Sequence, residues 1–283
     1  MTLLFTHSPS RPRRVFAHRG GAALAPENTI DAFERGLAAG ADGLECDVHL
    51  SADNVPVVIH DDLLQRTTDA TGPVSRFGAD ELARVDAGYH FASGAQHPWR
   101  GRGVRVPRLA EVLQCFRGVP IVIELKENST RLAGAVVETL RAADAVDRVC
   151  VGSFYWRVLR AVRHLEPAIA TGACREETRW AVYRTKVRLP IGRGVYSAFQ
   201  VPEMSGNTRV ISPRFVKAAH AAGKVVEAWT VNEPADMRRL LEWGVNDLIT
   251  DRPDLAVPLV RAWQTTQQHV TDSPNPAPDT GAP

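Results

Sequence analysis

Residues 43–61 read "GLECDVHLSADNVPVVIHD", and they contain two apolar runs typical of β-strands. Only "SADN" separates the runs, so we expect an antiparallel hairpin whose register places His60 opposite about Asp47. Glu45 and Asp47 share one face of the first run, because alternate residues of a strand point the same way. Cys46 should point the opposite way, towards a layer of helices. The hairpin therefore places polar side chains where a strand normally buries apolar ones.

Outside the hairpin, strand-like and helical patterns alternate along most of the chain. The strand candidates are 15–20, 42–48, 121–126, 149–154, 168–173, 195–200, 225–231 and 246–250. The helical patterns cover about 29–39, 107–117, 130–143, 155–165, 176–187, 212–222, 235–243 and 253–264. Such alternation indicates a parallel sheet, and eight units within about 250 residues are typical of a TIM (β/α)₈ barrel, an α/β fold. The first arm of the hairpin is then the second barrel strand, and its second arm folds back over the barrel mouth.

The barrel units occupy residues 15–265, with three further segments. Residues 61–106 contain many turn residues and no clear barrel element, so we interpret them as a small insertion after the strand-two hairpin, or a lid over the active end, with a helix near 79–85. Residues 1–14 form an N-terminal leader, whose basic cluster "RPRR" is expected to be solvated. Residues 266–283 are rich in proline and poor in large apolar side chains, which predicts a disordered tail.

Two helix starts carry recognisable capping residues. Asn28 is expected to cap the first helix, with Asp31 three residues later to complement the helix dipole. Ser212 followed by Pro213 is expected to start the helix at 212–222 in the same way.

Composition excludes several classes of function. The formal net charge of +2 over 283 residues is too small to favour nucleic-acid binding by bulk electrostatics. No run approaches the roughly 18 uncharged apolar residues needed to span a bilayer, so no stable membrane anchor is expected. The first residues lack the charge layout of a secretory signal, which predicts a cytoplasmic protein. The four cysteines show no C-x-x-C spacing, so we expect buried thiols, and no pattern indicates an oligomeric state.

The predicted strand ends carry an unusual set of polar residues. In a (β/α)₈ barrel, reactive residues lie at the C-terminal ends of the strands. Those ends, with the hairpin, supply His18, Arg19, Glu45, Asp47, His60, Glu124 and Lys126. Each residue alone would suit an exposed strand face, but three neighbouring carboxylates repel one another unless a cation lies among them. Oxygen ligands favour Mg²⁺ or Ca²⁺ over zinc.

A long segment of the chain resembles a known family. Residues 17–74, "AHRGGAALAPENTIDAFERGLAAGADGLECDVHLSADNVPVVIHDDLLQRTTDATGPV", are similar to the N-terminal signature of the glycerophosphodiester phosphodiesterase family. The similarity continues through "RVPRLAEVL", "IVIELK", "VGSF", "AWTVN" and "LITDRPD", and thus covers about residues 15–255. The resemblance implies a TIM barrel with an insertion after the His-Asp motif.

The resemblance also implies roles for matching residues. Glu45, Asp47 and Glu124 would bind one divalent cation, Ca²⁺ or Mg²⁺. His18 and His60 would form the acid–base pair, with His18 as base and His60 as acid by family analogy.

Two further positions would contact substrate, and a third is a candidate. Arg19 and Lys126 would contact the phosphate. Trp229 lies at the end of the seventh barrel strand. It would either pack as an apolar surface against the glycerol carbons or belong to the core.

The leading hypothesis is metal-dependent hydrolysis of small glycerophosphodiesters to sn-glycerol 3-phosphate and an alcohol. Attack by water and attack by a neighbouring glycerol hydroxyl, through a cyclic phosphate, both fit these residues. One alternative is a related barrel enzyme that acts on lysophospholipids (lysophospholipase D-like), although the insertion is mostly polar. Another is a non-catalytic barrel that binds a phosphorylated metabolite, although no histidine or carboxylate is missing. The sequence after Phe154 and the segment 188–210 depart from the family pattern near the mouth that would receive the alcohol.

Overall fold

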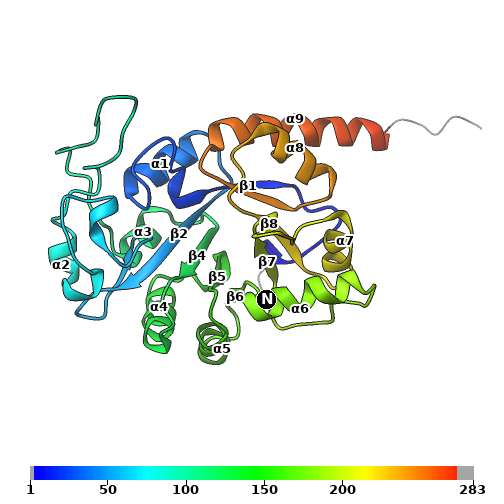
Figure 1. The fold of residues 1–283 in the computed structure, drawn as a ribbon, viewed down its shortest axis with the longest axis horizontal. Helices are drawn as coiled ribbons and strands as arrows, with labels where there is room; N and C mark the ends of the chain where they lie inside the picture. The colour runs from blue at the N-terminus through cyan, green and yellow to red at the C-terminus, as the bar shows by residue number, and fades with distance from the viewer. Residues whose placement is uncertain (1–2, 273–283) are drawn as a thin grey trace, which may run out of the picture.

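Eight parallel strands form the centre of the molecule in the computed structural model, which describes residues 3–272 and the side chains of 4–267 (Figure 1). The barrel strands are β1 (Arg14–Ala17), β2 (Gly43–Leu50), β4 (Ile121–Leu125), β5 (Val149–Gly152), β6 (Ala170–Thr171), β7 (Ala198–Val201), β10 (Val225–Ala228) and β11 (Asp247–Thr250). They pair in the order β6-β5-β4-β2-β1-β11-β10-β7. A parallel bridge between Gly172 and Ala198, with the hydrogen bond from Ser197 N to Thr171 O (2.8 Å), joins β6 to β7. The predicted (β/α)₈ barrel is confirmed.

Helices surround the barrel on all sides (Figure 1). They are α1 (Ile30–Ala38), α3 (Leu109–Cys115), α4 (Thr130–Ala142), α5 (Trp156–Leu165), α6 (Arg175–Lys186), α7 (Pro213–Ala221), α8 (Pro234–Glu242) and α9 (Pro253–Asp272). Two buried apolar clusters join helices to strands, one around β2, β4 and β5 that includes Cys46, and one around β7, β10 and β11. None of the helices within residues 3–272 is long and apolar enough to cross a membrane.

The helix caps agree with the sequence at one site and differ at the other. Ser212 Oγ accepts a hydrogen bond from Phe215 N at 3.2 Å, with Pro213 in the first turn, as predicted. Thr29, and not Asn28, caps α1, because Thr29 Oγ1 accepts the hydrogen bond from Ala32 N at 3.2 Å. Asn28 has a positive φ of 60°. Its side chain bonds to a strand instead, which removes it from the cap.

The hairpin forms with a register one residue from that expected. β3 (Pro56–Val58) pairs antiparallel with β2, and Val48 lies opposite Val58. Ile59 N donates to Asp47 O at 3.0 Å, so Ile59 and not His60 lies opposite Asp47. The cause is a five-residue loop, 51–55, which Ser51 N closes by donating to Val55 O at 3.0 Å. His60 lies beyond the last paired residue of β3. The alternation of side chains along the strand therefore does not determine which way the His60 side chain points.

Residues 61–106 pack beside the β2–β3 hairpin (Figure 1). They contain the short helices η3 (Leu64–Arg66), η4 (Val74–Arg76) and α2 (Ala79–Leu82). Apolar side chains of this segment, Leu64, Leu82 and Val104 among them, form a small core with Val57 and Ile59 of the hairpin. The segment is thereby attached to the arm that carries His60. The limits of the domain and of the insertion stay predictions.

Both ends of the described chain differ from expectation. Arg11 is not solvated, because its guanidinium pairs with the buried Asp247 carboxylate at 2.6 Å and its side chain is only 8% exposed. Phe5, in the 3₁₀ helix η1 (Leu3–Phe5), is fully buried against the inside of the barrel. At the other end, α9 continues through residues 266–272, where a disordered tail was predicted. The remainder of that tail, 273–283, lies outside the described residues.

The barrel interior holds one carboxyl group with an incomplete set of partners. Glu227 of β10 is fully buried, and Gln200 Nε2 donates to its Oε2 at 2.8 Å. Its Oε1 has no hydrogen-bond partner among the described residues. Burial, followed by the negative charge of Asp247, raises the pKa of Glu227 to about 8 from an ordinary 4.5. The folded protein therefore keeps a proton here that the unfolded chain has already lost at neutral pH.

Stability should consequently fall as the pH rises from about 4.5 to about 8, since the folded state binds the additional proton in that window. In the wild type, this group should lower the free energy of unfolding by about 1 kcal/mol per pH unit within that window. We expect Glu227→Gln to abolish this contribution, because a neutral amide does not titrate. Urea unfolding at pH 5.5 and 7.5 measures the slope. Glu138→Gln on the exposed surface of α4 is the matched control and should keep the wild-type slope. An unchanged slope in Glu227→Gln would contradict the raised pKa.

Candidate active site

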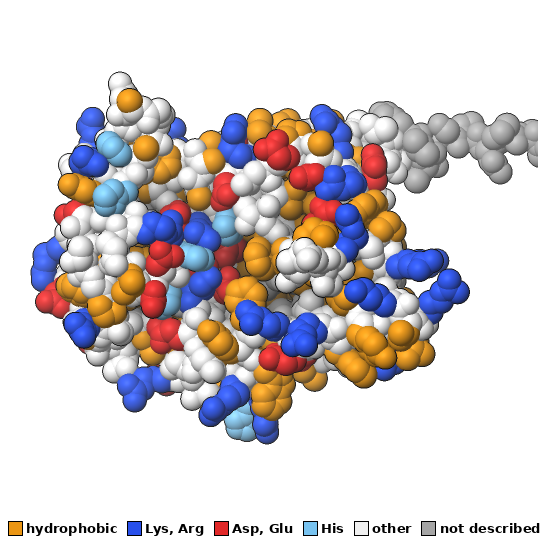
Figure 2. Space-filling model, in the orientation of Figure 1, with side chains coloured by type: hydrophobic (Ala, Val, Ile, Leu, Met, Phe, Trp, Pro, Cys, Tyr) orange, Lys and Arg blue, Asp and Glu red, His pale blue; other side chains and the backbone are white. Residues whose placement is uncertain are grey.

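A cavity of about 900 Å³ opens at the C-terminal ends of the barrel strands, visible as a hollow in Figure 2. Seven of the eight predicted site residues line it, namely His18, Arg19, Glu45, His60, Glu124, Lys126 and Trp229. The eighth, Asp47, lies directly behind Lys126, whose Nζ is 3.4 Å from Asp47 Oδ1. Side chains from the ends of four barrel strands, β1, β2, β4 and β10, and from the β3 arm thus meet in one space, as the strand-end rule predicts.

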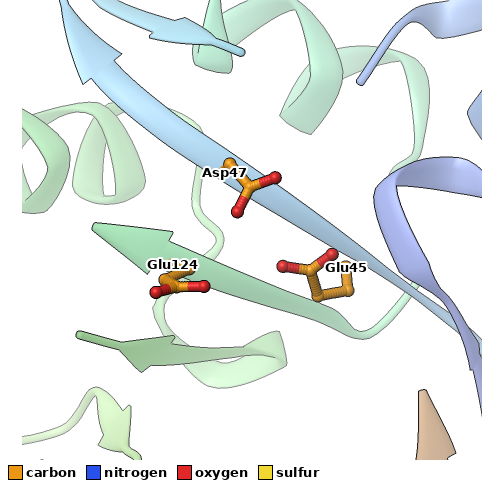
Figure 3. A group of neighbouring side chains, drawn as sticks. All are labelled: Glu45, Asp47 and Glu124. Atoms are coloured by element: carbon orange, nitrogen blue, oxygen red, sulfur yellow. The ribbon is translucent and has the colours of Figure 1, made fainter. Parts of the chain in front are cut away.

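Three carboxylates form the floor of this site. Glu45 and Asp47 share one face of β2, and Glu124 on β4 is the register neighbour of Asp47. Figure 3 shows the three carboxylate groups turned towards a common space. One oxygen from each lies within 4.8 Å of the others, which is a spacing that one cation can bridge. The donors are all oxygens, which suits a hard divalent ion such as Ca²⁺ or Mg²⁺.

The carboxylates differ in how well the protein compensates their charges. Burial, followed by the charge of Asp47, raises the pKa of Glu45 to about 8. Burial, with Asp47, also raises the pKa of Glu124. Burial alone would raise the pKa of Asp47 too, but Lys126 and Arg19 outweigh it and hold that pKa below its usual value. The protein's own cations therefore compensate one carboxylate, and a bound cation would compensate the other two.

Arg19 is held in place by the same carboxylates. Its backbone N donates to Glu45 Oε2 at 2.9 Å, which a left-handed backbone conformation (φ 51°) permits. Its Nε lies 3.2 Å from Asp47 Oδ2, and its Nη1 donates to Glu27 Oε1 at 2.8 Å. Asn28 Nδ2 donates to Asp47 Oδ2 at 2.8 Å, which explains why Asn28 is unavailable as a helix cap. The positive side chains and the metal-binding candidates thus form one network.

Each of the two histidines is paired with an aspartate. His18 Nδ1 donates to Asp251 Oδ1 at 2.6 Å, and His60 Nδ1 donates to Asp61 Oδ1 at 2.6 Å. Both pairs leave Nε2 for proton transfer, and Nε2 of His18 lies 3.8 Å from Glu45 Oε2. An aspartate on Nδ1 fixes the ring orientation and the tautomer.

The two histidines differ in pKa. Burial would lower the pKa of His18, but Glu45 and the Asp251 hydrogen bond outweigh it, so the pKa is raised. Burial lowers the pKa of His60 despite the charge of Asp47 and the bond to Asp61. The environments therefore push the two imidazoles in opposite directions, a difference that suits an acid–base pair.

Sequence reasoning did not assign Asp251. It lies directly after β11, and Asn232 Nδ2 donates to its other oxygen, Oδ2, at 2.7 Å. The strand-end rule that selected His18 could have selected it, since "LITD" ends the eighth strand. Its pairing with a residue 233 positions away, however, is visible only in the folded barrel.

Trp229 lies at the boundary between core and cavity. It follows β10, lines the cavity and packs partly against the apolar barrel interior. Its ring meets Phe154 edge-to-face with centroids 6.1 Å apart. Both interpretations of this tryptophan, as a core residue and as a wall of the site, are therefore compatible with its position.

Together these features define a (β/α)₈-barrel enzyme with a polar site of carboxylates, cations and aspartate-paired histidines. Residues 18–255 match the glycerophosphoryl diester phosphodiesterase family, and the chain belongs to this family. The predicted family, fold class and enzyme class are confirmed.

Two curated relatives match over nearly their whole length. The chain is 31% identical over 252 residues to a glycerophosphodiester phosphodiesterase of Caldanaerobacter subterraneus subsp. tengcongensis, covering 87% of this chain and 97% of that protein. It is 34% identical over 252 residues to a glycerophosphodiester phosphodiesterase of Bacillus altitudinis, and this match covers 86% of this chain and 96% of that protein.

Solved structures agree with the fold. A putative glycerophosphoryl diester phosphodiesterase from Silicibacter pomeroyi matches with a TM-score of 0.74 at 27% identity, covering 92% of this chain and 96% of that one. A phosphodiesterase from Oleispira antarctica, in complex with the product sn-glycerol-3-phosphate, matches with a TM-score of 0.72 at 26% identity, covering 88% and 96%.

Proposed function

We propose that the protein hydrolyses glycerophosphodiesters to sn-glycerol 3-phosphate and an alcohol, with one divalent cation, Ca²⁺ or Mg²⁺, held by Glu45, Asp47 and Glu124. The observation that carries the proposal is the convergence of these three carboxylates, within 4.8 Å, beside two aspartate-paired histidines in one cavity. The Oleispira antarctica phosphodiesterase, which has the same fold, was solved with sn-glycerol-3-phosphate, and this supports the proposed product.

The cation, when bound, would neutralise charge that develops on the phosphate oxygens. Arg19 and Lys126 add to this effect from the protein. Both line the cavity and both contact Asp47, at 3.2 Å and 3.4 Å, so their charges lie beside the candidate metal site. A phosphodiester is an anion that repels nucleophiles, and two cationic side chains at this point would bind its oxygens and reduce that repulsion.

His18 and His60 would move the two protons that the reaction requires. One imidazole accepts a proton from the attacking hydroxyl, of water or of the neighbouring glycerol, and the other donates a proton to the leaving alkoxide. In the protein without a cation, the pKa directions favour protonated His18 and neutral His60. A cation beside Glu45 would oppose the effect that raises the pKa of His18. The assignment of His18 as base and His60 as acid stays a prediction, as does a cytoplasmic location.

Product analysis tests the proposed function directly. With glycerophosphocholine and Ca²⁺ or Mg²⁺, we expect choline and sn-glycerol 3-phosphate in equal amounts, because the alcohol-side P–O bond breaks. Mass spectrometry of the products, with the Asp47→Asn protein as blank, measures this. Release of phosphocholine and glycerol would contradict the bond assignment. Faster turnover of lysophosphatidylcholine would favour the lysophospholipase D-like alternative, and tight binding without turnover would favour a non-catalytic barrel.

A further inference from the structure

One face of α6 forms a wall of the cavity that also contains the carboxylates. The residues of α6 that line the cavity are Arg175, Thr178, Arg179, Val182, Tyr183 and Lys186. Most of them recur at spacings of three and four, so they share one face of the helix. Ala181 is the single buried residue of α6, unlike the other barrel helices of its length, which bury several. The helix therefore stands off from the strands, and the cavity continues along it.

This face of α6 carries three positive charges and no negative one. Arg175, Arg179 and Lys186, which we term the α6 cationic row, make no ion pair with a carboxylate in the part of the chain that the structure describes. Glu45 and Glu124 of the candidate metal site are the acidic residues among those that line the cavity. Figure 2 shows Lys and Arg side chains along the rim of the hollow, over α6.

Aromatic side chains connect the α6 cationic row to the candidate metal site. The Arg175 guanidinium carbon lies 5.1 Å from the centre of the Phe154 ring, and Phe154 packs edge-to-face on Trp229. Trp229 and Phe154 line the same cavity as His18 and Lys126. At about 900 Å³ the cavity is near the upper end of the ~300–1,000 Å³ typical of small-molecule pockets, so it has room beyond a bound glycerol phosphate.

The chemistry of this wall favours an anionic group over a cationic or a long apolar one. Unpaired guanidinium and ammonium groups bind phosphate and carboxylate oxygens and repel the ammonium of choline. A long acyl chain requires a continuous apolar wall, whereas on this face three charged side chains interrupt the apolar surface of Val182 and Tyr183. The segment 188–210, which departs from the family pattern, contributes Pro202, Ser205 and Thr208 to the same cavity.

We propose that the α6 cationic row is the subsite for the leaving alcohol and selects glycerophosphodiesters whose alcohol carries a further negative charge, such as a second phosphate or a carboxylate. The inference rests on the proposed function, because the bond broken is the same. A hydroxyl oxygen, of water or of the neighbouring glycerol, adds to phosphorus, the P–O bond to the alcohol breaks, and the anionic alcohol leaves with a proton; where glycerol attacks first, water then opens the cyclic phosphate.

Two matched pairs of substrates test this preference. Glycerophosphoserine differs from glycerophosphoethanolamine by one carboxylate, and bis(glycerophospho)glycerol differs from glycerophosphoglycerol by one glycerophosphate group. For each pair, the readout is the ratio of kcat/KM for the more anionic member to that for the other. We expect wild-type ratios of about ten, which fall as salt is added from 0.05 to 0.5 M, because two or three solvent-facing charge contacts are each worth a few-fold and are screened.

The double variant Arg179→Gln/Lys186→Gln should reduce both ratios to about one. The matched control is Arg214→Gln/Lys217→Gln on the exposed surface of α7, which removes the same net charge outside the cavity and should keep the wild-type ratios. Circular dichroism of both variants checks that the fold is retained.

The outcomes separate this inference from the proposed function. If the wild type hydrolyses the diesters but shows ratios near one, or ratios that Arg179→Gln/Lys186→Gln leaves unchanged, the subsite is wrong and the proposed function stands. If the wild type hydrolyses none of the four diesters, both fail. If the double variant loses binding to vesicles of anionic lipid and keeps its ratios, the row meets a membrane surface and the subsite is again overturned.

Discussion

His18→Ala and His60→Ala should each lower kcat for glycerophosphocholine by about a thousandfold, within the ~10²–10⁴ that a general acid or base contributes. Each substitution removes the imidazole that would transfer a proton at Nε2, while the aspartate that orients it, Asp251 or Asp61, remains. Steady-state kinetics over pH 5–9 measures the effect. Each variant should also lose one limb of the wild-type pH–rate profile, since each limb reports one titrating group.

A matched histidine shows whether the loss is specific. His164→Ala, on the exposed surface of α5, removes an imidazole outside the cavity and should retain wild-type kcat. Thermal unfolding of all three variants should show a folded protein. A kcat within tenfold of wild type in His18→Ala or His60→Ala, with the fold retained, would exclude that histidine from proton transfer.

Removal of divalent cations should abolish turnover, and Ca²⁺ or Mg²⁺ should restore it. The physical reason is that Glu45, Asp47 and Glu124 lie within 4.8 Å of one another, and the protein's own cations compensate Asp47 most strongly. A cation that binds the folded state alone also stabilises it, by about 2.7 kcal/mol at a concentration of 100 Kd. Activity with EDTA, and thermal unfolding with and without added cation, measure the two effects independently.

The binding of the cation should strengthen as the pH rises towards 8. The pKa of Glu45 is raised to about 8 in the protein without a cation, so binding must displace a proton below that pH. Calorimetric titration at pH 6.5 and 8 should show this difference. Asp47→Asn/Glu124→Gln should lose both the stabilisation and the titration heat, and Glu138→Gln should retain them. Full activity in EDTA would refute the assignment of the metal site.

The strand-end residues could be predicted because their signal is local. Glu45 and Asp47 are two residues apart in one strand, and Glu124 and Lys126 repeat that spacing in the next barrel strand. In a parallel barrel all C-terminal strand ends meet at one mouth. The alternation of side chains along each strand, together with the fold class, therefore predicts that these residues lie at that mouth. The hairpin could be predicted from a similarly local signal. Its predicted register was one residue off because of the length of the loop at 51–55.

The partners of these residues were not predictable, because they come from distant parts of the chain. Asp251 binds His18 across 233 positions, and Arg11 binds Asp247 across 236. Asparagine is a residue type favoured at helix N-caps. The amide of Asn28 nevertheless donates to Asp47, and Thr29 caps the helix instead. Such choices between a local and a distant hydrogen bond depend on which groups the packed barrel brings within reach.

Local pattern thus established the alternating strands and helices, the barrel and the identities of the reactive side chains, because periodicity and strand-end position are properties of short segments. Tertiary packing decided which aspartate orients each histidine, that Asp47 is compensated while Glu45 is left with a raised pKa, and that α6 turns its cationic row towards the cavity. These properties depend on burial and on distances between atoms far apart in the sequence, and folding alone creates them.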